Sequence, residues 1–183
     1  MPKVIIIPGN GGGKPMDNWF PYVEEELSKK GYEVLNREFP DSLLARESHW
    51  IPFLKEELKA DGDTILVGHS SGAIAALRFA ETNKIMGSVL VGAYHTDLNM
   101  ESERVSEYFN RPWDWKAIRQ NQQWTAIFAS SDDPWIPIDE ARFLHKELQA
   151  DYYEYSDRGH FGGDYYKQDF PELAQAIIRR LKQ

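Results

Sequence analysis

The sequence of 183 residues contains no cysteine. This absence excludes disulfide bonds, a thiol nucleophile, cysteine-bound zinc and iron–sulfur clusters, so any catalysis must use oxygen and nitrogen atoms. Long hydrophobic runs are also absent, because the apolar run at residues 4–7 is far shorter than the roughly 20 residues of a membrane span. It is equally too short for the core of a signal peptide. We therefore expect a cytoplasmic protein with no membrane partner.

Basic residues are few relative to acidic ones. Lysine and arginine total 21, and aspartate and glutamate total 29, which gives a formal net charge of −8. A phosphate backbone repels an acidic chain, so we expect no nucleic-acid partner. The five histidines are scattered without an HxH or HExxH spacing, so the sequence predicts no metal site.

Apolar, β-branched segments alternate along the chain with segments of helical period. The predicted strands span residues 3–7, 32–39, 64–67, 88–91, 125–129 and 151–155. The predicted helices span residues 19–30, 47–59, 71–82, 138–148 and 171–181. Strands that are almost wholly apolar are typical of a parallel sheet with helices on both faces. We therefore expect one α/β domain over residues 1–183, with the poorly alternating segment 32–39 at an edge of its sheet.

One interval interrupts this alternation of strands and helices. Residues 94–112 are polar, charged and rich in asparagine, glutamate and serine, with no clear period. We interpret them as a small lid-like excursion over the carboxyl ends of the strands, where open α/β sheets bind their ligands.

A G-x-S-x-G motif lies between a predicted strand and a predicted helix. Residues 68–72 read GHSSG, and a nucleophile at such a sharp turn needs glycine two positions before and after it, here Gly68 and Gly72. The turn would expose the hydroxyl of Ser70 and aim the amide of Ser71 into the same space. The alternative is a plain strand-to-helix turn with a serine N-cap.

A serine nucleophile requires a histidine base and an acid, in the chain order serine, acid, histidine. Among the five histidines, His160 alone lies in a suitable place, in the glycine-rich loop 157–163 between the last strand and the last helix. The acid should follow strand 125–129, where the chain reads SSDDP. We favour Asp133, because a residue before proline is held extended. Asp132 is the alternative, and Asp97 is a reserve.

The glycine-rich segment PGNGGG at residues 8–13 follows the first strand. It matches neither the phosphate-binding GxxxxGK[ST] pattern nor the dinucleotide-binding GxGxxG pattern, so no nucleotide or other cofactor is predicted. We predict instead that the backbone N–H of Asn10 completes an oxyanion hole with Ser71. A simple flexible turn is the alternative.

Large aromatic residues follow the predicted strands or lie in the excursion. We expect them to line a pocket for the acyl or leaving group, although such residues also pack lids onto protein bodies. The candidates are Tyr94, Phe109, Trp113, Trp135 and Phe161.

With these motifs placed, the chain resembles the small α/β-hydrolase-fold serine hydrolases of the retinoblastoma-binding protein nine type and their bacterial relatives. The matching stretches are residues 8–13, 45–48, 68–73, 109–113, 131–134 and 159–161. The resemblance implies a three-layer α/β-hydrolase-like fold with strand order 2-1-3-4-5-6 and a triad of Ser70, Asp133 and His160. The chain departs from the family in one respect. The vertebrate member takes its name from an L-x-C-x-E segment, and the corresponding stretch here reads LKADG at residues 58–62. Binding to retinoblastoma-type pocket proteins is therefore not expected.

The residues and the resemblance predict the same function. We expect a serine hydrolase that cleaves small ester or amide substrates through an acyl-enzyme. The alternative is a catalytically silent protein-interaction module that keeps the fold without its chemistry.

Overall fold

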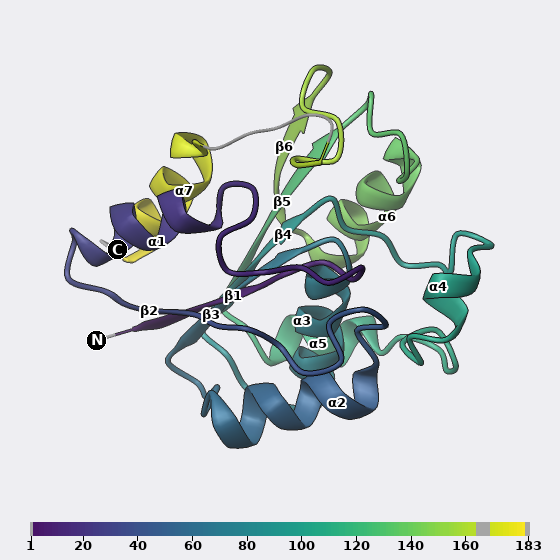
Figure 1. Cartoon of the computed structure of the whole chain (residues 1–183), viewed down its shortest axis with the longest axis horizontal. Helices are drawn as coiled ribbons and strands as arrows, with labels where there is room; N and C mark the ends of the chain where they lie inside the picture. The colour runs from purple at the N-terminus through teal and green to yellow at the C-terminus, as the bar shows by residue number, and fades with distance from the viewer. Residues whose placement is uncertain (1, 164–168, 182–183) are drawn as a thin grey trace.

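The computed structural model describes residues 2–163 and 169–181. Its centre is a sheet of six strands in the order β2-β1-β3-β4-β5-β6, and every neighbouring pair is parallel (Figure 1). The strands are β1 (Lys3–Ile7), β2 (Glu33–Asn36), β3 (Thr64–His69), β4 (Gly87–Val91), β5 (Trp124–Ser130) and β6 (Asp151–Tyr155). The predicted fold and strand order are confirmed, with β2 at an edge.

Helices cover both faces of the sheet (Figure 1). On one face lie α1 (Phe20–Ser28) and α7 (Pro171–Leu181). On the other face lie α2 (Glu47–Pro52), α3 (Ser71–Thr82), α5 (Trp115–Gln120) and α6 (Ile138–Leu148). Within the described residues, none of the helices is both long enough and apolar enough to cross a membrane.

Alternate residues of the central strands supply the two hydrophobic cores. In β3, Leu66 packs into the core under α3, while Ile65 and Val67 pack into the core under α1 and α7. All six residues of β3 are buried, whereas the four residues of the edge strand β2 are only partly buried or exposed. Because side chains alternate between the faces of a strand, a strand covered on both faces is apolar throughout.

Two helical segments differ from the prediction. The single helix expected at residues 47–59 is α2 followed by a π-helical turn, η1 (Phe53–Glu57). Pro52 has no N–H to donate, and directly after it the pattern widens, with the Leu58 amide donating to the Phe53 carbonyl. The helix α5 was not predicted, although Asp114 caps it by accepting a hydrogen bond from the Ala117 amide.

The excursion at residues 94–112 lies beyond the carboxyl end of β4 and contains one short helix, α4 (Glu101–Arg104) (Figure 1). Arg78 of α3 reaches the far end of the excursion, where the guanidinium donates to the carbonyl oxygens of Tyr108 and Arg111.

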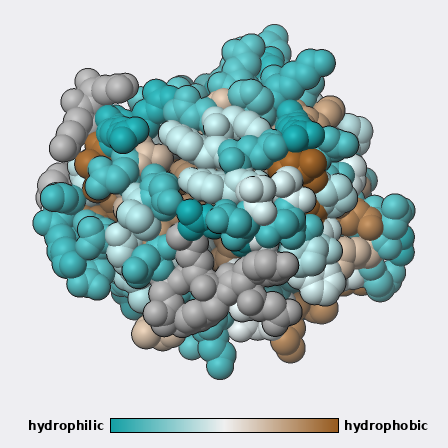
Figure 2. Space-filling view, turned by 90° about the horizontal axis from the view of Figure 1, so that it is seen from above, coloured by the Kyte–Doolittle hydropathy of each residue, from teal (hydrophilic) through white to brown (hydrophobic). Residues whose placement is uncertain are grey.

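Figure 2 views the molecule from above and shows a mostly hydrophilic face, with hydrophobic residues in small separate groups.

Candidate active site

The serine of the G-x-S-x-G motif lies at a strained turn between β3 and α3. Ser70 has φ 54° and ψ −121°, a combination that residues with side chains rarely adopt, and its amide donates to the Val91 carbonyl at 2.9 Å. A Cβ on Gly68 would lie 2.3 Å from the carbonyl oxygen of Gly72. A Cβ on Gly72 would lie 2.3 Å from the carbonyl oxygen of Ile7. The turn therefore requires glycine at both positions.

The structure brings His160 and Asp133 together. Nδ1 of His160 lies 2.7 Å from Oδ2 of Asp133, whose side chain is only 3% exposed. The other oxygen, Oδ1, accepts hydrogen bonds from the amides of Trp135 and Ile136 at 2.9 and 3.0 Å. A carboxylate that accepts from Nδ1–H fixes the tautomer of the ring and leaves Nε2 as the basic nitrogen.

The neighbouring aspartate supports the histidine loop instead. Oδ1 of Asp132 accepts from the Ser130 hydroxyl at 2.5 Å and from the Gly159 amide at 2.9 Å. The bond from Ser130 is the main reason why the pKa of Asp132 lies below its ordinary value. The reserve acid, Asp97, pairs with Arg104 on the excursion at 3.2 Å. Of the three candidates, Asp133 is thus the one that contacts His160.

His69, next to the serine, anchors the loop that carries His160. Its Nε2 donates to the backbone carbonyl of His160 at 2.7 Å, and the ring is almost completely buried. Burial, followed by the nearby charge of His160, lowers the pKa of His69 to about 3. His69 therefore stays neutral at physiological pH. His69 was not expected to be the base, and this anchoring role was not predicted, although its position beside Ser70 could have suggested it.

Gly92, directly after β4, leaves the space that the His160 ring occupies. Its φ is +59°, and a Cβ there would lie 3.0 Å from Cε1 of His160 and 3.8 Å from Oδ2 of Asp133. No sequence motif marks this glycine, because the ring that it accommodates comes from a distant loop.

The glycine-rich loop at residues 8–13 passes beside Ser70. A Cβ on Gly9 would lie 3.3 Å from Cβ of Ser70, so the two backbones approach closely. Neither the amide of Asn10 nor that of Ser71 has a hydrogen-bond acceptor within the described part of the chain. Two free N–H groups in this region fit the predicted oxyanion hole.

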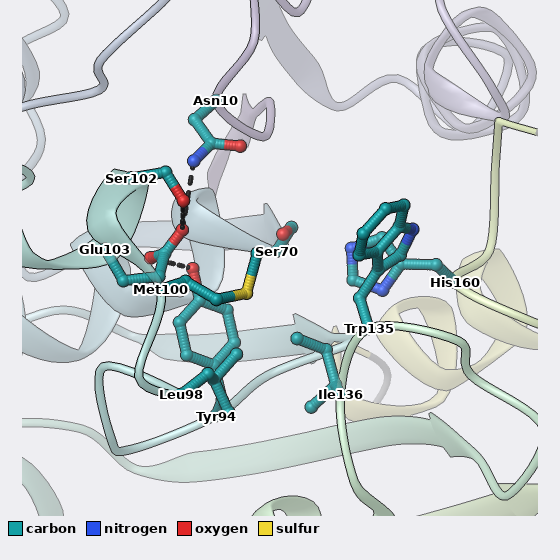
Figure 3. Close-up of a pocket in the computed structure, with 10 residues that line it drawn as sticks. All are labelled: Asn10, Ser70, Tyr94, Leu98, Met100, Ser102, Glu103, Trp135, Ile136 and His160. Carbon is teal, nitrogen blue, oxygen red and sulfur yellow. Dashed lines mark hydrogen bonds between the residues drawn. The ribbon is translucent and has the colours of Figure 1, made fainter.

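Two hollows meet at Ser70 and His160. The first has a volume of about 240 Å³ and a largely apolar lining (Figure 3). Its lining residues are Asn10, Ser70, Tyr94, Leu98, Met100, Ser102, Glu103, Trp135, Ile136 and His160. The second, of about 210 Å³, is more polar and is bordered by the glycine-rich loop. A substrate bound across Ser70 can thus place one part in each hollow.

The predicted aromatic lining is only partly placed at the cavity. Tyr94 and Trp135 line it, together with Ser70 and His160 (Figure 3). Phe109 and Trp113 are not lining residues: Phe109 stacks on Tyr94 with ring centroids 5.8 Å apart, and Trp113 lies beyond it. They form the packing layer of the excursion.

The prediction that Phe161 lines the pocket is wrong. Its side chain is completely buried and stacks against Phe170 in the core beneath α1 and α7, with ring centroids 5.5 Å apart. The Phe161 carbonyl also accepts a hydrogen bond from Nε1 of Trp19. Phe161 therefore anchors the histidine loop from the core side and is not a pocket residue.

A parallel sheet that carries a serine at such a turn, with an Asp–His pair beyond its later strands, defines an α/β hydrolase. The serine hydrolase family profile matches residues 4–179. Rat "Serine hydrolase RBBP9" is 43% identical over 177 residues, which cover 96% of this chain and 93% of that protein. The chain belongs to the serine hydrolase family.

More distant relatives agree on the fold. The "Putative hydrolase YdeN" of Bacillus subtilis is 26% identical over 166 residues, covering 88% of this chain and 87% of that protein. The crystal structure of the ydeN gene product superimposes with a TM-score of 0.90 at 25% identity and covers all of both chains. A putative non-heme bromoperoxidase, BpoC of Mycobacterium tuberculosis, has a TM-score of 0.74 at 14% identity, with 100% of this chain and 92% of that chain covered. This last likeness concerns the fold alone.

Proposed function

We propose that this hydrolase cleaves small esters or amides through an acyl-enzyme, with Ser70 as nucleophile, His160 as general base and Asp133 as the acid that orients it. The observation that carries the proposal is the 2.7 Å bond between Asp133 and His160, in a cavity that His160 shares with Ser70. The chain order serine, acid, histidine is also that of α/β hydrolases. We further propose that the enzyme acts in the cytoplasm.

The reaction has two steps. Ser70 Oγ attacks the substrate carbonyl carbon while Nε2 of His160 takes the hydroxyl proton, and the carbonyl oxygen becomes an oxyanion. His160 then gives the proton to the leaving alcohol or amine, and the carbon–oxygen or carbon–nitrogen bond breaks. Water, deprotonated by His160, then attacks the ester on Ser70. His160 returns the proton to Ser70 Oγ as the bond from Oγ to the acyl carbon breaks and the carboxylic acid leaves. The amides of Asn10 and Ser71 donate to the oxyanion in both steps.

The surroundings of His160 favour its protonated intermediate. Oδ2 of Asp133 places a negative charge against the imidazolium that forms, and two backbone amides hold the other oxygen, Oδ1. His69 touches the same loop but remains neutral, so it does not oppose the developing charge. Ser71 begins α3, and a helix N-terminus favours the negative oxyanion.

The cavity limits the size of the substrate. At about 240 Å³ it is smaller than most pockets for drug-sized ligands, which start at about 300 Å³. Leu98, Met100 and Ile136 supply much of its apolar wall. We therefore propose a short apolar or aromatic acyl group here, with the leaving group in the polar hollow beside the glycine-rich loop.

A fluorophosphonate probe tests the proposal, because it reacts with an activated serine. Wild-type protein is labelled, and intact mass and peptide mapping locate the adduct. We expect modification of Ser70 and no labelling of Ser70→Ala at an unchanged thermal midpoint. Ser131→Ala, which removes an exposed hydroxyl, is the matched control and keeps full labelling. A folded wild-type protein that does not label would favour the catalytically silent interaction module.

A further inference from the structure

A buried carboxylate that the proposed chemistry does not use lies beside the nucleophile. Glu103 of α4 is 4% exposed and lines the same cavity as Ser70 (Figure 3). Its Oε1 accepts from Nδ2 of Asn10 at 3.0 Å and from the Ser102 hydroxyl at 3.3 Å. Its Oε2 accepts from the Tyr94 hydroxyl at 2.6 Å. Burying a charge is costly unless it is hydrogen-bonded, and here neutral donors supply those bonds.

Tyr94 extends these contacts to the nucleophile turn. Its hydroxyl lies 3.3 Å from Oγ of Ser71. Burial, followed by the charge of Glu103, raises the pKa of Tyr94 well above its ordinary value, so the phenol keeps the proton that it donates to Glu103. A chain of hydrogen bonds thus runs from Asn10 through Glu103 and Tyr94 to Ser71. Its two ends are the residues whose amides are proposed to bind the oxyanion.

The glycine-rich loop needs such an anchor. Three glycines follow Asn10, and glycine loses more conformational freedom on folding than any other residue. The amides of Gly11 and Gly12 donate to the carbonyls of Leu43 and Ser42, which holds the two residues that follow Asn10. On Asn10 itself, the bond to Glu103 is the one hydrogen bond found within the described residues.

We infer that Glu103 is a positioning residue for the oxyanion hole, holding the loop amide of Asn10 on one side and, through Tyr94, the turn at Ser71 on the other. The inference rests on the proposed function, because an oxyanion forms only if Ser70 attacks a carbonyl. Oxyanion contacts are made in the transition state and not in the bound substrate. Misplacing the amides therefore lowers kcat and leaves KM unchanged.

The test measures kcat and KM on p-nitrophenyl acetate for four variants beside wild type. Glu103→Ala is expected to lower kcat about tenfold, less than the roughly 10²–10³-fold cost of losing a donor. Glu103→Gln is expected to keep a kcat within about threefold of the wild-type value. Its amide oxygen can accept from Asn10 while its nitrogen donates to the Tyr94 hydroxyl. Tyr94→Phe, which removes one hydroxyl, gives an intermediate loss. Glu101→Ala, on the same short helix but exposed, stays at the wild-type rate.

A double-mutant cycle separates positioning from a general structural effect. Asn10→Ala keeps the backbone amide but removes the side chain that Glu103 holds. If Glu103 acts through Asn10, the double variant loses no more activity than the more damaging single variant. Thermal midpoints are measured in parallel, so that a loss of folded protein is not counted as a loss of kcat.

Three results would overturn the inference. Losses that multiply in the double variant would show that Glu103 does not act through Asn10. A raised KM at unchanged kcat would show that Glu103 contacts the substrate directly. Wild-type protein that neither turns over the ester nor labels at Ser70 would contradict the proposed function, and the positioning role with it.

Discussion

The two halves of the candidate site are held in place by different means. Ser70 and Asp133 follow β3 and β5, whose residues are almost all buried. The hydrogen-bonded strands of the sheet therefore fix the backbone from which these two side chains extend. The excursion at residues 94–112 has little core of its own. Side chains that reach it from other elements hold it instead.

Three such side chains approach the excursion from different directions. Arg78, whose side chain has no exposed surface, donates to backbone carbonyls at its end and lies under Trp113, with the guanidinium carbon 3.6 Å from the ring centroid. Glu140 of α6 accepts from the amide of His95 at its start. Asn10 contacts its middle through Glu103. We therefore expect substitutions in the sheet-borne half of the site, which contains Ser70, Asp133 and the His160 that Asp133 contacts, to abolish chemistry. Substitutions around the excursion should instead change rate and stability.

The largest expected effect separates the adjacent aspartates of the sheet-borne half. Asp133→Asn keeps the size of the side chain but removes the charge that orients His160, so kcat should fall about 10³–10⁴-fold. Asp132→Asn disturbs the bonds from Ser130 and Gly159, which support the histidine loop, and a loss of about tenfold is expected. Steady-state kinetics on an activated ester, with circular dichroism as a check of folding, measures both. Equal losses would contradict the choice of Asp133.

The second prediction addresses the strongest anchor of the excursion. Arg78→Met leaves buried carbonyls without a donor and Glu81 without its close partner. The free energy of unfolding should therefore fall by about 3–5 kcal/mol. Arg142→Met is the matched control, because Arg142 is half exposed and its surface pairs contribute at most about 1 kcal/mol. Urea denaturation measures both variants. If they lost equal stability, Arg78 would not be the anchor.

A third prediction concerns the space beside His160. Gly92→Ala would bring a methyl group within 3.0 Å of the imidazole at a positive φ, so activity should fall about 10–100-fold as the ring is displaced. Gly31→Ala is the matched control, since Gly31 also has a positive φ but nothing lies within 4 Å of its added methyl group. That variant should lose about 1 kcal/mol of stability and no activity. Comparable kinetics in the two variants would show that the His160 ring does not depend on the space beside Gly92.

The smallest expected effect is the pH response of the contact between α6 and the excursion. Burial raises the pKa of Glu140, but hydrogen bonds from His95 and Thr96 outweigh it and lower that pKa to about 2. The ionised Glu140 carboxylate therefore stabilises the folded protein fully at pH values above its unfolded pKa of 4.5. This stabilisation disappears as the pH falls from about 5 to 2. Glu140→Gln should therefore lose about 1–3 kcal/mol at pH 7 and show a flatter stability profile in that range. Urea unfolding at several pH values measures the difference, and parallel profiles would contradict it.

Much of the fold could be predicted because its signals are local. The apolar runs of β1 and β3 and the alanine-rich α3 are recognisable within single segments. The helical features that were missed depend on single residues, namely Pro52 before the π-helical turn and Asp114 at the N-cap of the unpredicted helix α5. These residues change hydrogen bonding over one turn, an effect that periodicity does not report.

By itself, the sequence determined which segments become buried strands and where the strained turn at Ser70 falls, because these features depend on apolar runs and on glycines close together in the chain. Only the tertiary structure decided which side chains meet. His160 contacts Asp133 and not Asp132, Phe161 turns into the core, and Glu103 reaches Asn10 across 93 positions of the chain. Such contacts depend on how the loops that follow different strands pack together at the carboxyl end of the sheet. No local sequence pattern encodes that packing.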